Sequence, residues 1–198
     1  QVGLGNVANS LQLVAASNLS DVADAATAFA AIKQAASDSA TGVSELALAS
    51  EVTTGTDAAR VVTPDALAGS DFGKSVVSIL IFNDSQNVAV GDGAGDMFWR
   101  VPAVLNGYNL VAVAAQVQTA GTTNATTIQV RNVTQGADML SANMQIESGE
   151  TDTLTGVAGT IDTANDDVAT GDSIRIDVDA VSTTPPKGLV VELTFQLP

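Results

Sequence analysis

The sequence contains no cysteine and no histidine, and these two absences exclude several kinds of chemistry. Without cysteine there are no disulfides and no thiolate nucleophile. Without histidine there is neither a histidine-dependent triad nor a histidine-ligated metal site. Carboxylate chemistry and calcium binding by oxygen ligands remain open. No pair of carboxylates stands out in an aromatic cleft, as a glycosidase would need, so we expect the protein not to be an enzyme.

Basic and aromatic residues are also scarce. Seven Lys and Arg residues face 22 Asp and Glu residues, which gives a net charge of −15. Such a surface repels phosphate backbones and anionic lipids, so we expect neither nucleic-acid binding nor membrane association. Aromatic residues make up only 4% of the chain, and small apolar side chains bury little area each, which favours thin or repetitive architectures. No run reaches transmembrane length.

Residues 1–40 are predicted to be helical. Apolar residues recur with three-four-three spacing in two sets separated by a slip of phase: Leu4, Val7, Leu11 and Val14, and then Leu19, Val22, Ala26 and Phe29. This is coiled-coil spacing, but each set is short, so an amphipathic helix packed on a neighbouring domain is the alternative. Because short alanine-rich helices are unstable alone, we expect them to have partners. Ser20 is the predicted cap of the second helix.

Residues 41–73 are predicted to form a small α/β segment followed by a linker. "GVSELALA" alternates weakly, as a strand would, and "TGTD" is a turn signal. In "VVTPDALAGS", Thr63 is a natural N-cap, Pro64 occupies the first helical position, and Gly69 follows the last. The predicted helix is therefore little more than one turn long, and "SDFGK" links it to the remaining residues 74–198.

Two motifs in this first part of the chain resemble bacteriophage tail fibres. "NLSDVADAATAFAAI" resembles the "NLSD…AATAR" unit of those fibres, and "SATGVSELALASEVTTGTDAARVVTPDALA" resembles their "TG…ELA" and "EV…GTD…VTP…LA" repeat. The residues that keep the spacing of the repeat are Gly42, Glu45, Leu46, Ala47, Glu51, Val52, Gly55, Thr56, Asp57, Val62, Thr63, Pro64 and Leu67. The resemblance spans roughly residues 3–69. The chain departs from the pattern of these fibres in one respect: it has frequent alanine at positions where such helices often carry larger residues.

The resemblance implies a homotrimeric fibre, in which the repeat forms a small collar between a shaft and a tip. The residues expected to line the three-fold axis are Leu4, Val7, Leu11, Val14, Val22 and Phe29. It also implies that the chain belongs to the virion, in a tail or fibre, and contacts other virion tail proteins.

Residues 74–198 are predicted to form an antiparallel β-sandwich of the jelly-roll type. "DSIRIDVDAV" places Ile174, Ile176 and Val178 on one face, and "LVVELTFQL" aligns alternate apolar residues from Leu189 to Leu197. Further strands are expected at "SVVSILIF", "MFWRVP", "LVAVAAQV", "TTIQVRNV", "DMLS" and "MQIE". About eight short strands between Gly-, Asn- and Asp-rich turns are typical of such sandwiches. This region also resembles the C-terminal β-domain of many phage virion fibres, so the predicted fold class is mainly β.

The strand "SVVSILIF" has apolar residues on both faces. One set is Val77, Ile79 and Ile81, and the other is Val76, Leu80 and Phe82. Since a sandwich strand needs only one apolar face, the second face is expected to be covered by the protein's own fold or by another subunit. In a trimer it would meet the three-fold axis.

Two segments carry candidate ligand-binding groups. Asp92 and Asp96 in "GDGAGDMFWR" have oxygen ligands for calcium, but the segment lacks the spacing and the closing acid of an EF-hand, which favours an ordinary acidic loop and no cofactor. Trp99 and Tyr108 are either a sugar-stacking platform or, as the strand-like setting of Trp99 favours, core residues.

Three functions follow from these features. The first is the distal part of a phage tail fibre that binds a bacterial surface receptor, expected to be a glycan. The alternative is a structural virion fibre on the capsid or baseplate without a receptor role. A polysaccharide depolymerase tip is third, because histidine is absent and aromatic residues are sparse. For the first function, the polar loops expected to face the receptor carry Asp92, Asp96, Thr122, Asn124, Glu150 and Asp152.

Overall fold

The computed structural model describes residues 24–33, 35–37 and 42–198. Contacts divide the chain into two compact units. One comprises Gln1–Ala47 and Asp57–Val61, and the other comprises Leu48–Thr56 and Val62–Pro198. The predicted collar stretch, residues 41–73, is therefore shared between the two units. Five of the residues predicted to line a trimer axis lie outside the described residues: Leu4, Val7, Leu11, Val14 and Val22.

In the described part of the first unit, the elements are one helix and one pair of short strands. Helix α1 (Ala25–Ile32) begins after Asp24, whose carboxylate accepts a hydrogen bond from the Thr27 backbone N–H at 2.9 Å. The cap of this helix is thus Asp24, whereas Ser20, the predicted cap, lies outside the described residues. Strand β1 (Glu45–Leu46) pairs in parallel with β2 (Arg60–Val61). Phe29 of α1 is 53% exposed, so its ring is open to contact with another chain.

The second unit opens with two short helices and one 3₁₀ turn: α2 (Ala49–Thr54), α3 (Pro64–Ala68) and η2 (Asp71–Gly73). The predicted start of α3 is confirmed, because Pro64 is its first residue and Thr63 Oγ1 accepts a hydrogen bond from Ala66 N–H at 3.1 Å. Gln196, near the end of the last strand, donates from Nε2 to the carbonyl oxygens of Ala68 (2.9 Å) and Ser70 (3.0 Å). These two bonds tie the helical segment to the sandwich.

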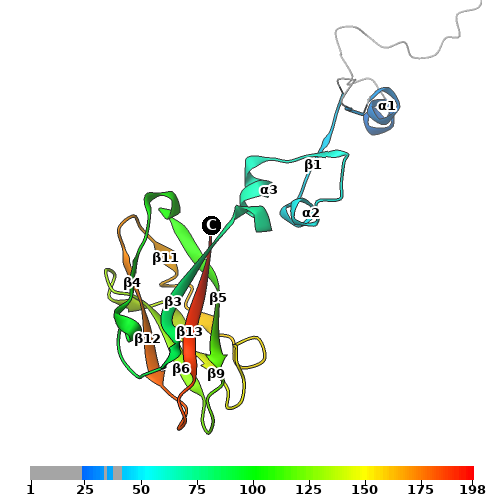
Figure 1. Ribbon diagram of the computed structural model, residues 1–198. Helices are drawn as coiled ribbons and strands as arrows, with labels where there is room; N and C mark the ends of the chain where they lie inside the picture. The colour runs from blue at the N-terminus through cyan, green and yellow to red at the C-terminus, as the bar shows by residue number, and fades with distance from the viewer. Residues whose placement is uncertain (1–23, 34, 38–41) are drawn as a thin grey trace, which may run out of the picture. The chain divides into compact units, whose positions relative to one another are not determined.

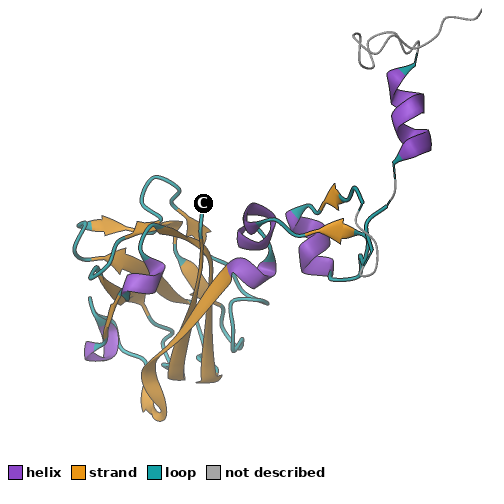
Figure 2. Ribbon diagram, turned by 90° about the horizontal axis from the view of Figure 1, so that it is seen from above, coloured by secondary structure: helices purple, strands orange, loops and turns teal. Residues whose placement is uncertain are grey.

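The remainder of the second unit is a β-rich, sandwich-like structure (Figures 1 and 2). Its strands are β3 (Lys74–Asn87), β4 (Phe98–Arg100), β5 (Tyr108–Thr119), β6 (Thr126–Asn132), β7 (Ala137–Asp138), β8 (Leu140–Ala142), β9 (Met144–Ile146), β10 (Thr160–Ile161), β11 (Asp167–Val168), β12 (Ser173–Ala180) and β13 (Lys187–Gln196). Two 3₁₀ turns, η3 (Ala94–Asp96) and η4 (Ala103–Leu105), interrupt the loops. The prediction of a mainly β fold with antiparallel sheets is confirmed.

Two sheets enclose the core. Sheet A has the strand order β11-β5-β13-β3, and sheet B has the order β4-β12-β6-β7, with β9 also paired to β6. Strands β8 and β10 form a separate antiparallel pair. No pairing among the described strands closes either sheet into a barrel.

Alternating residues of both sheets fill the core, as the period-two patterns predicted. Leu189, Val191, Leu193 and Phe195 of β13 are completely buried, and Ile174, Ile176 and Val178 of β12 are 1% exposed. Leu197, which the same pattern placed in this row, follows the end of β13 and is 45% exposed. The pattern therefore held only as far as the strand itself.

The lone tryptophan belongs to this core. Trp99 of β4 stacks on Phe195 of β13, with ring centroids 5.5 Å apart and ring planes 29° apart. Tyr108 is also partly buried against the core. The core alternative for Trp99 and Tyr108 is therefore the one that the structure shows.

None of the described helices is long and apolar enough to cross a lipid bilayer.

Candidate functional site

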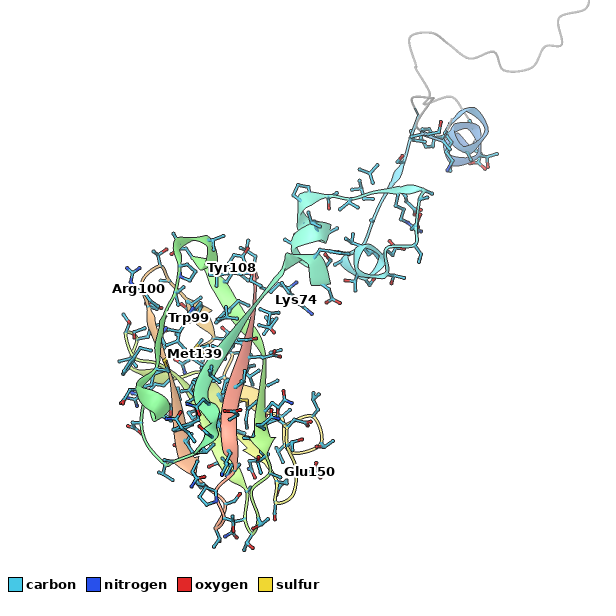
Figure 3. The ribbon with its side chains drawn as sticks, in the orientation of Figure 1. Lys74, Trp99, Arg100, Tyr108, Met139 and Glu150 are labelled. Atoms are coloured by element: carbon cyan, nitrogen blue, oxygen red, sulfur yellow. The ribbon has the colours of Figure 1, made fainter. Side chains whose placement is uncertain are left out.

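The register of sheet A defines two ends of the sandwich. At one end, Lys74 of β3 pairs with Gln196 of β13, which pairs with Asn109 of β5. At the other end, Asn87, Lys187 and Thr119 occupy the matching positions. The chain thus enters and leaves the sandwich at the Lys74 end. The loops after β3 and β5 and the loop before β13 lie at the opposite end, which we call the remote end. In Figure 3, the label of Lys74 marks the end where the chain enters, and Glu150 lies far below it.

Three chain segments meet at the remote end through backbone hydrogen bonds. Thr122 and Thr184 exchange two N–H···O bonds of 3.1 Å, and Thr183 N–H donates to Thr123 O at 2.8 Å. The third segment joins through Gly149 N–H, which donates to Gly121 O at 2.9 Å. We call six of the exposed polar side chains of these segments the remote-end cluster: Thr122, Thr123, Asn124, Ser148, Thr183 and Thr184. These six side chains are uncharged, whereas the whole chain carries −15 and the exposed Glu147 precedes Ser148 in the third segment.

The backbone of the cluster is held in an uncommon conformation. Thr123 and Asn124 adopt positive φ angles of 61° and 69°, a region that is costly for a β-branched residue and persists only where the surroundings enforce it. Ser148 Oγ accepts from Thr123 N–H at 2.8 Å, and Ser182 Oγ donates to Asn124 O at 3.0 Å. A Cβ at Gly121 would lie 2.5 Å from Ser182 Oγ, so only glycine permits this close packing.

This arrangement displays hydroxyl and amide groups in fixed positions. Such groups both donate and accept hydrogen bonds, so they match neutral polyhydroxylated ligands better than charged ones. Of the six residues predicted to face a receptor, the structure places Thr122 and Asn124 in the cluster.

Glu150 and Asp152 lie in the adjoining loop of residues 150–157, beside β5. Asp152 forms a β-bridge with Gln116 of β5, and its carboxylate accepts from the N–H groups of Leu154 (2.9 Å) and Thr155 (3.0 Å). The hydrogen bond from the Thr155 N–H is the main cause that lowers the pKa of Asp152. Glu150 accepts a hydrogen bond from the Thr155 hydroxyl. Both carboxylates therefore form hydrogen bonds within their own loop and hold its conformation.

Asp92 and Asp96 lie in the η3 segment beside β12, apart from the remote-end cluster. Asp92 pairs with Arg175 at 3.0 Å, and Arg175 also binds both carboxylate oxygens of Asp177 at 2.7 and 2.9 Å. Gly93 N–H donates to the same Asp177 at 2.7 Å. Asp92 is thus already matched by a positive charge. Among the residues that the structure describes, no group of three or more acidic side chains is arranged to hold a metal ion.

The outer face of sheet A is a second notable surface. Ile79 and Ile81 of β3 are buried, whereas Val76 and Leu80 on the opposite face are 61% and 55% exposed. Phe82, predicted to share the exposed face, is only 9% exposed and belongs to the core. A register shift separates the Leu80–Val190 pair from the pair of Phe82 with the buried Leu189, so Phe82 does not share the face of Leu80.

The strands next to β3 continue this apolar, nearly uncharged face. Their outward positions are Val190, Glu192 and Thr194 on β13, opposite Gln116, Ala114 and Ala112 on β5. Glu192 is the charged residue of this set, and it accepts a hydrogen bond from Ser78 Oγ at 3.1 Å. Sheet B differs, because ion pairs such as Arg131–Asp138 and Arg175–Asp177 lie on it. Sequence reasoning found the contribution of β3 but missed Leu154, which is 87% exposed beside this face.

No protein family and no curated protein matches this chain. Its similarity to tail fibres therefore depends on the motifs in its own sequence.

Proposed function

We propose that this chain is the distal part of a bacteriophage tail fibre, and that three copies present their remote-end clusters to a receptor on the bacterial surface. The observation that carries the proposal is the remote-end cluster itself. It is polar, uncharged and rigid, and it lies opposite the end at which the chain enters the sandwich. In a fibre whose shaft is N-terminal, that end is the first to meet a cell.

The charge of the sandwich narrows the class of receptor. Between residues 84 and 192, fourteen acidic residues face only four basic ones. Because bacterial envelopes are anionic, this surface gains nothing from long-range attraction, and binding depends on short-range hydrogen bonds. We propose a neutral stretch of surface glycan as the ligand. No catalytic role and no resident cofactor is part of the proposal.

Trimerisation completes the proposal. The apolar outer face of sheet A and the exposed Phe29 are surfaces that further copies would cover. Three tethered sites bind far more strongly than one, because the second and third contacts form at high effective concentration. A jelly-roll-like tip preceded by short trimeric helices and a small collar is the architecture that we propose for the assembled fibre.

The test is retention of the fluorescently labelled full chain by a panel of bacterial strains and by their purified surface glycans. We expect at least one strain to retain the protein. The variant Thr122→Ala/Asn124→Gly/Thr184→Ala should lose about tenfold or more of that retention, since each hydrogen bond contributes about 0.5–1.5 kcal/mol. Glycine at position 124 preserves the positive φ angle.

A matched control truncates exposed threonines away from the cluster, in the variant Thr163→Ala/Thr170→Ala. Its retention should equal that of the unchanged chain. Equal retention of the cluster variant and the unchanged chain, or no retention by any strain, would favour a structural virion fibre without a receptor role.

A further inference from the structure

Two buried hydroxyl groups support the remote-end cluster from inside the fold. Thr126 is completely buried and Ser182 is 4% exposed, and their hydroxyl oxygens lie 3.2 Å apart. Ser182 Oγ donates its one hydrogen to Asn124 O at 3.0 Å, so the Thr126 hydroxyl must donate to Ser182 Oγ. Ser182 N–H in turn donates to Thr126 Oγ1 at 3.2 Å. Both hydroxyl groups are therefore used within the fold, and together they fix the carbonyl group of Asn124.

The side chain of Asn124 is bonded to a second member of the cluster. Its Nδ2 donates to Thr183 Oγ1 at 3.3 Å, and the two residues are 59 positions apart in the chain. Ser182 directly precedes Thr183, so the buried hydroxyl pair anchors both residues. These two exposed side chains therefore form one unit, which we call the Asn124–Thr183 pair.

The hydrogen bond within the Asn124–Thr183 pair decides which groups remain for a ligand. Because Nδ2 donates to Thr183 Oγ1, Asn124 Oδ1 remains as an acceptor and the Thr183 hydroxyl hydrogen remains as a donor. Neither group is bonded to another side chain in the described part of the protein. A rotation of the amide group by 180° would exchange the two roles. In either arrangement the pair presents an acceptor beside a donor.

An acceptor beside a donor matches two hydroxyl groups on neighbouring carbons of a sugar ring. One of these hydroxyls accepts from Thr183, and the other donates to Asn124, because every hydroxyl can do both. A carboxylate or phosphate offers acceptors only and would leave Asn124 Oδ1 without a donor. The exposed Glu147, at the same end of the sandwich, also repels such anions.

We infer that the Asn124–Thr183 pair recognises a vicinal diol of a neutral sugar, and that Thr126 and Ser182 are positioning residues that hold the pair in its binding geometry. This inference rests on the proposed function and names the part of the glycan that the remote-end cluster contacts. Gly121 belongs to the same support, because a Cβ there would lie 2.5 Å from Ser182 Oγ and 3.0 Å from Pro186 Cδ. A ligand group of fixed geometry is bound best by protein groups that are already in place.

Periodate tests the chemistry of the ligand directly. It breaks the carbon–carbon bond between two neighbouring hydroxyl-bearing carbons and oxidises each carbon to an aldehyde, while periodate is reduced to iodate. Borohydride then reduces the aldehydes to alcohols, so that the glycan keeps its hydroxyl groups and loses their fixed spacing. A purified glycan that retains the labelled full chain should lose about tenfold or more of that retention after this treatment. Treatment with iodate in place of periodate is the control and should leave retention unchanged.

A matched pair of variants locates the diol on the protein. Thr183→Val removes the hydroxyl, keeps the shape of the side chain and should lower retention about tenfold. Thr170→Val is the control, because the Thr170 hydroxyl also bonds to an asparagine, Asn106 Oδ1, at 3.1 Å, but near the start of β5 at the Lys74 end. Its retention should equal that of the unchanged chain. On the periodate-treated glycan, Thr183→Val and the unchanged chain should be retained equally, because the contact is already lost.

The positioning role is tested by NMR together with retention. A strong nuclear Overhauser effect between the amide and Hα protons of Asn124 marks its positive φ angle of 69°. Thr126→Val should weaken this signal and lower retention about tenfold, whereas Thr126→Ser keeps the hydroxyl and should preserve both. Ser182→Ala should act as Thr126→Val does. An unchanged signal in folded Thr126→Val and Ser182→Ala would overturn the positioning role.

The outcomes separate this inference from the proposed function. Glycan retention that is unaffected by periodate, or by Thr183→Val, would overturn the diol assignment and leave a glycan receptor standing. Retention by whole cells that resists periodate and is lost after protease treatment would indicate a peptide receptor, and it would overturn both the inference and the proposed glycan. No retention by any strain would also contradict both.

Discussion

Leu80 and Leu193 are leucines of adjacent strands in sheet A, and they point to opposite sides of it. Leu193 is completely buried between the sheets, whereas Leu80 is 55% exposed on the outer face. A residue of the same type thus serves the core in one place and an open surface in the other. At the residue scale, the exposed apolar side chains on the outer face of sheet A are the ones that contact with a partner would bury.

These two leucines give a matched prediction. Leu193→Ala should lower the free energy of unfolding by about 2–5 kcal/mol, because it leaves a cavity in the core. Leu80→Ala should change the free energy of unfolding of the monomer by no more than about 0.5 kcal/mol. Chemical denaturation at a low protein concentration measures both. A large loss for Leu80→Ala under these conditions would mean that the chain covers this side chain itself.

At the residue scale, local rules also separate what sequence can predict from what it cannot. The cap at Thr63 was predictable because its partners lie within three residues of it. The exposure of Leu154 was not, since it depends on a loop anchored to Asp152 and to the distant Gln145. Asp92 was a calcium candidate by its neighbours in sequence, but its actual partner, Arg175, comes from a strand more than 80 residues away.

At the scale of elements, the 150–157 loop is the part whose geometry most depends on one ionised group. The N–H group of Thr155 donates to the Asp152 carboxylate and lowers its pKa below the ordinary value of 3.8. A carboxyl whose pKa is lowered by folding stabilises the folded loop above its ordinary pKa. That contribution is lost as the pH falls through the lowered, folded-state pKa.

We therefore expect the Leu154 and Thr155 amides to stay protected near neutral pH and to lose protection as the pH falls below about 3.8. Hydrogen exchange of the full chain followed by NMR between pH 6 and pH 2 measures this. The Thr123 amide is an internal control, because it bonds to the neutral Ser148 hydroxyl outside this loop. In Asp152→Asn, the acid-dependent step should disappear. Its persistence in that variant would assign the step to another group.

The strands themselves were largely predictable, and their arrangement was not. Period-two alternation identified β12 and β13 because every second residue of a strand faces the core. Apolar segments between Gly-, Asn- and Asp-rich turns identified β3, β5 and β6. The remote-end cluster joins Thr122, Ser148 and Thr183, whose proximity comes from strand pairing across the whole domain. No local pattern encodes such pairing, so the polar loops were predicted one by one and their meeting point was found only in the structure.

At the scale of the whole molecule, the proposed function requires a strongly acidic chain to reach an anionic cell surface. A net charge of −15 provides no electrostatic capture, and one uncharged cluster offers few hydrogen bonds. A single tip domain would therefore bind weakly, and useful strength would come from several tips held together. Useful binding in the proposed function therefore depends on the association of three chains.

The mass of the full chain in solution tests that central claim most directly. Light scattering at micromolar concentration should give three times the chain mass of 19.9 kDa, and dilution should not reduce it until the concentration falls far below that range. A mass of 19.9 kDa throughout the micromolar range would contradict trimer formation. A lone chain would leave Phe29, Val76 and Leu80 uncovered, and the proposed fibre would lack its other two chains.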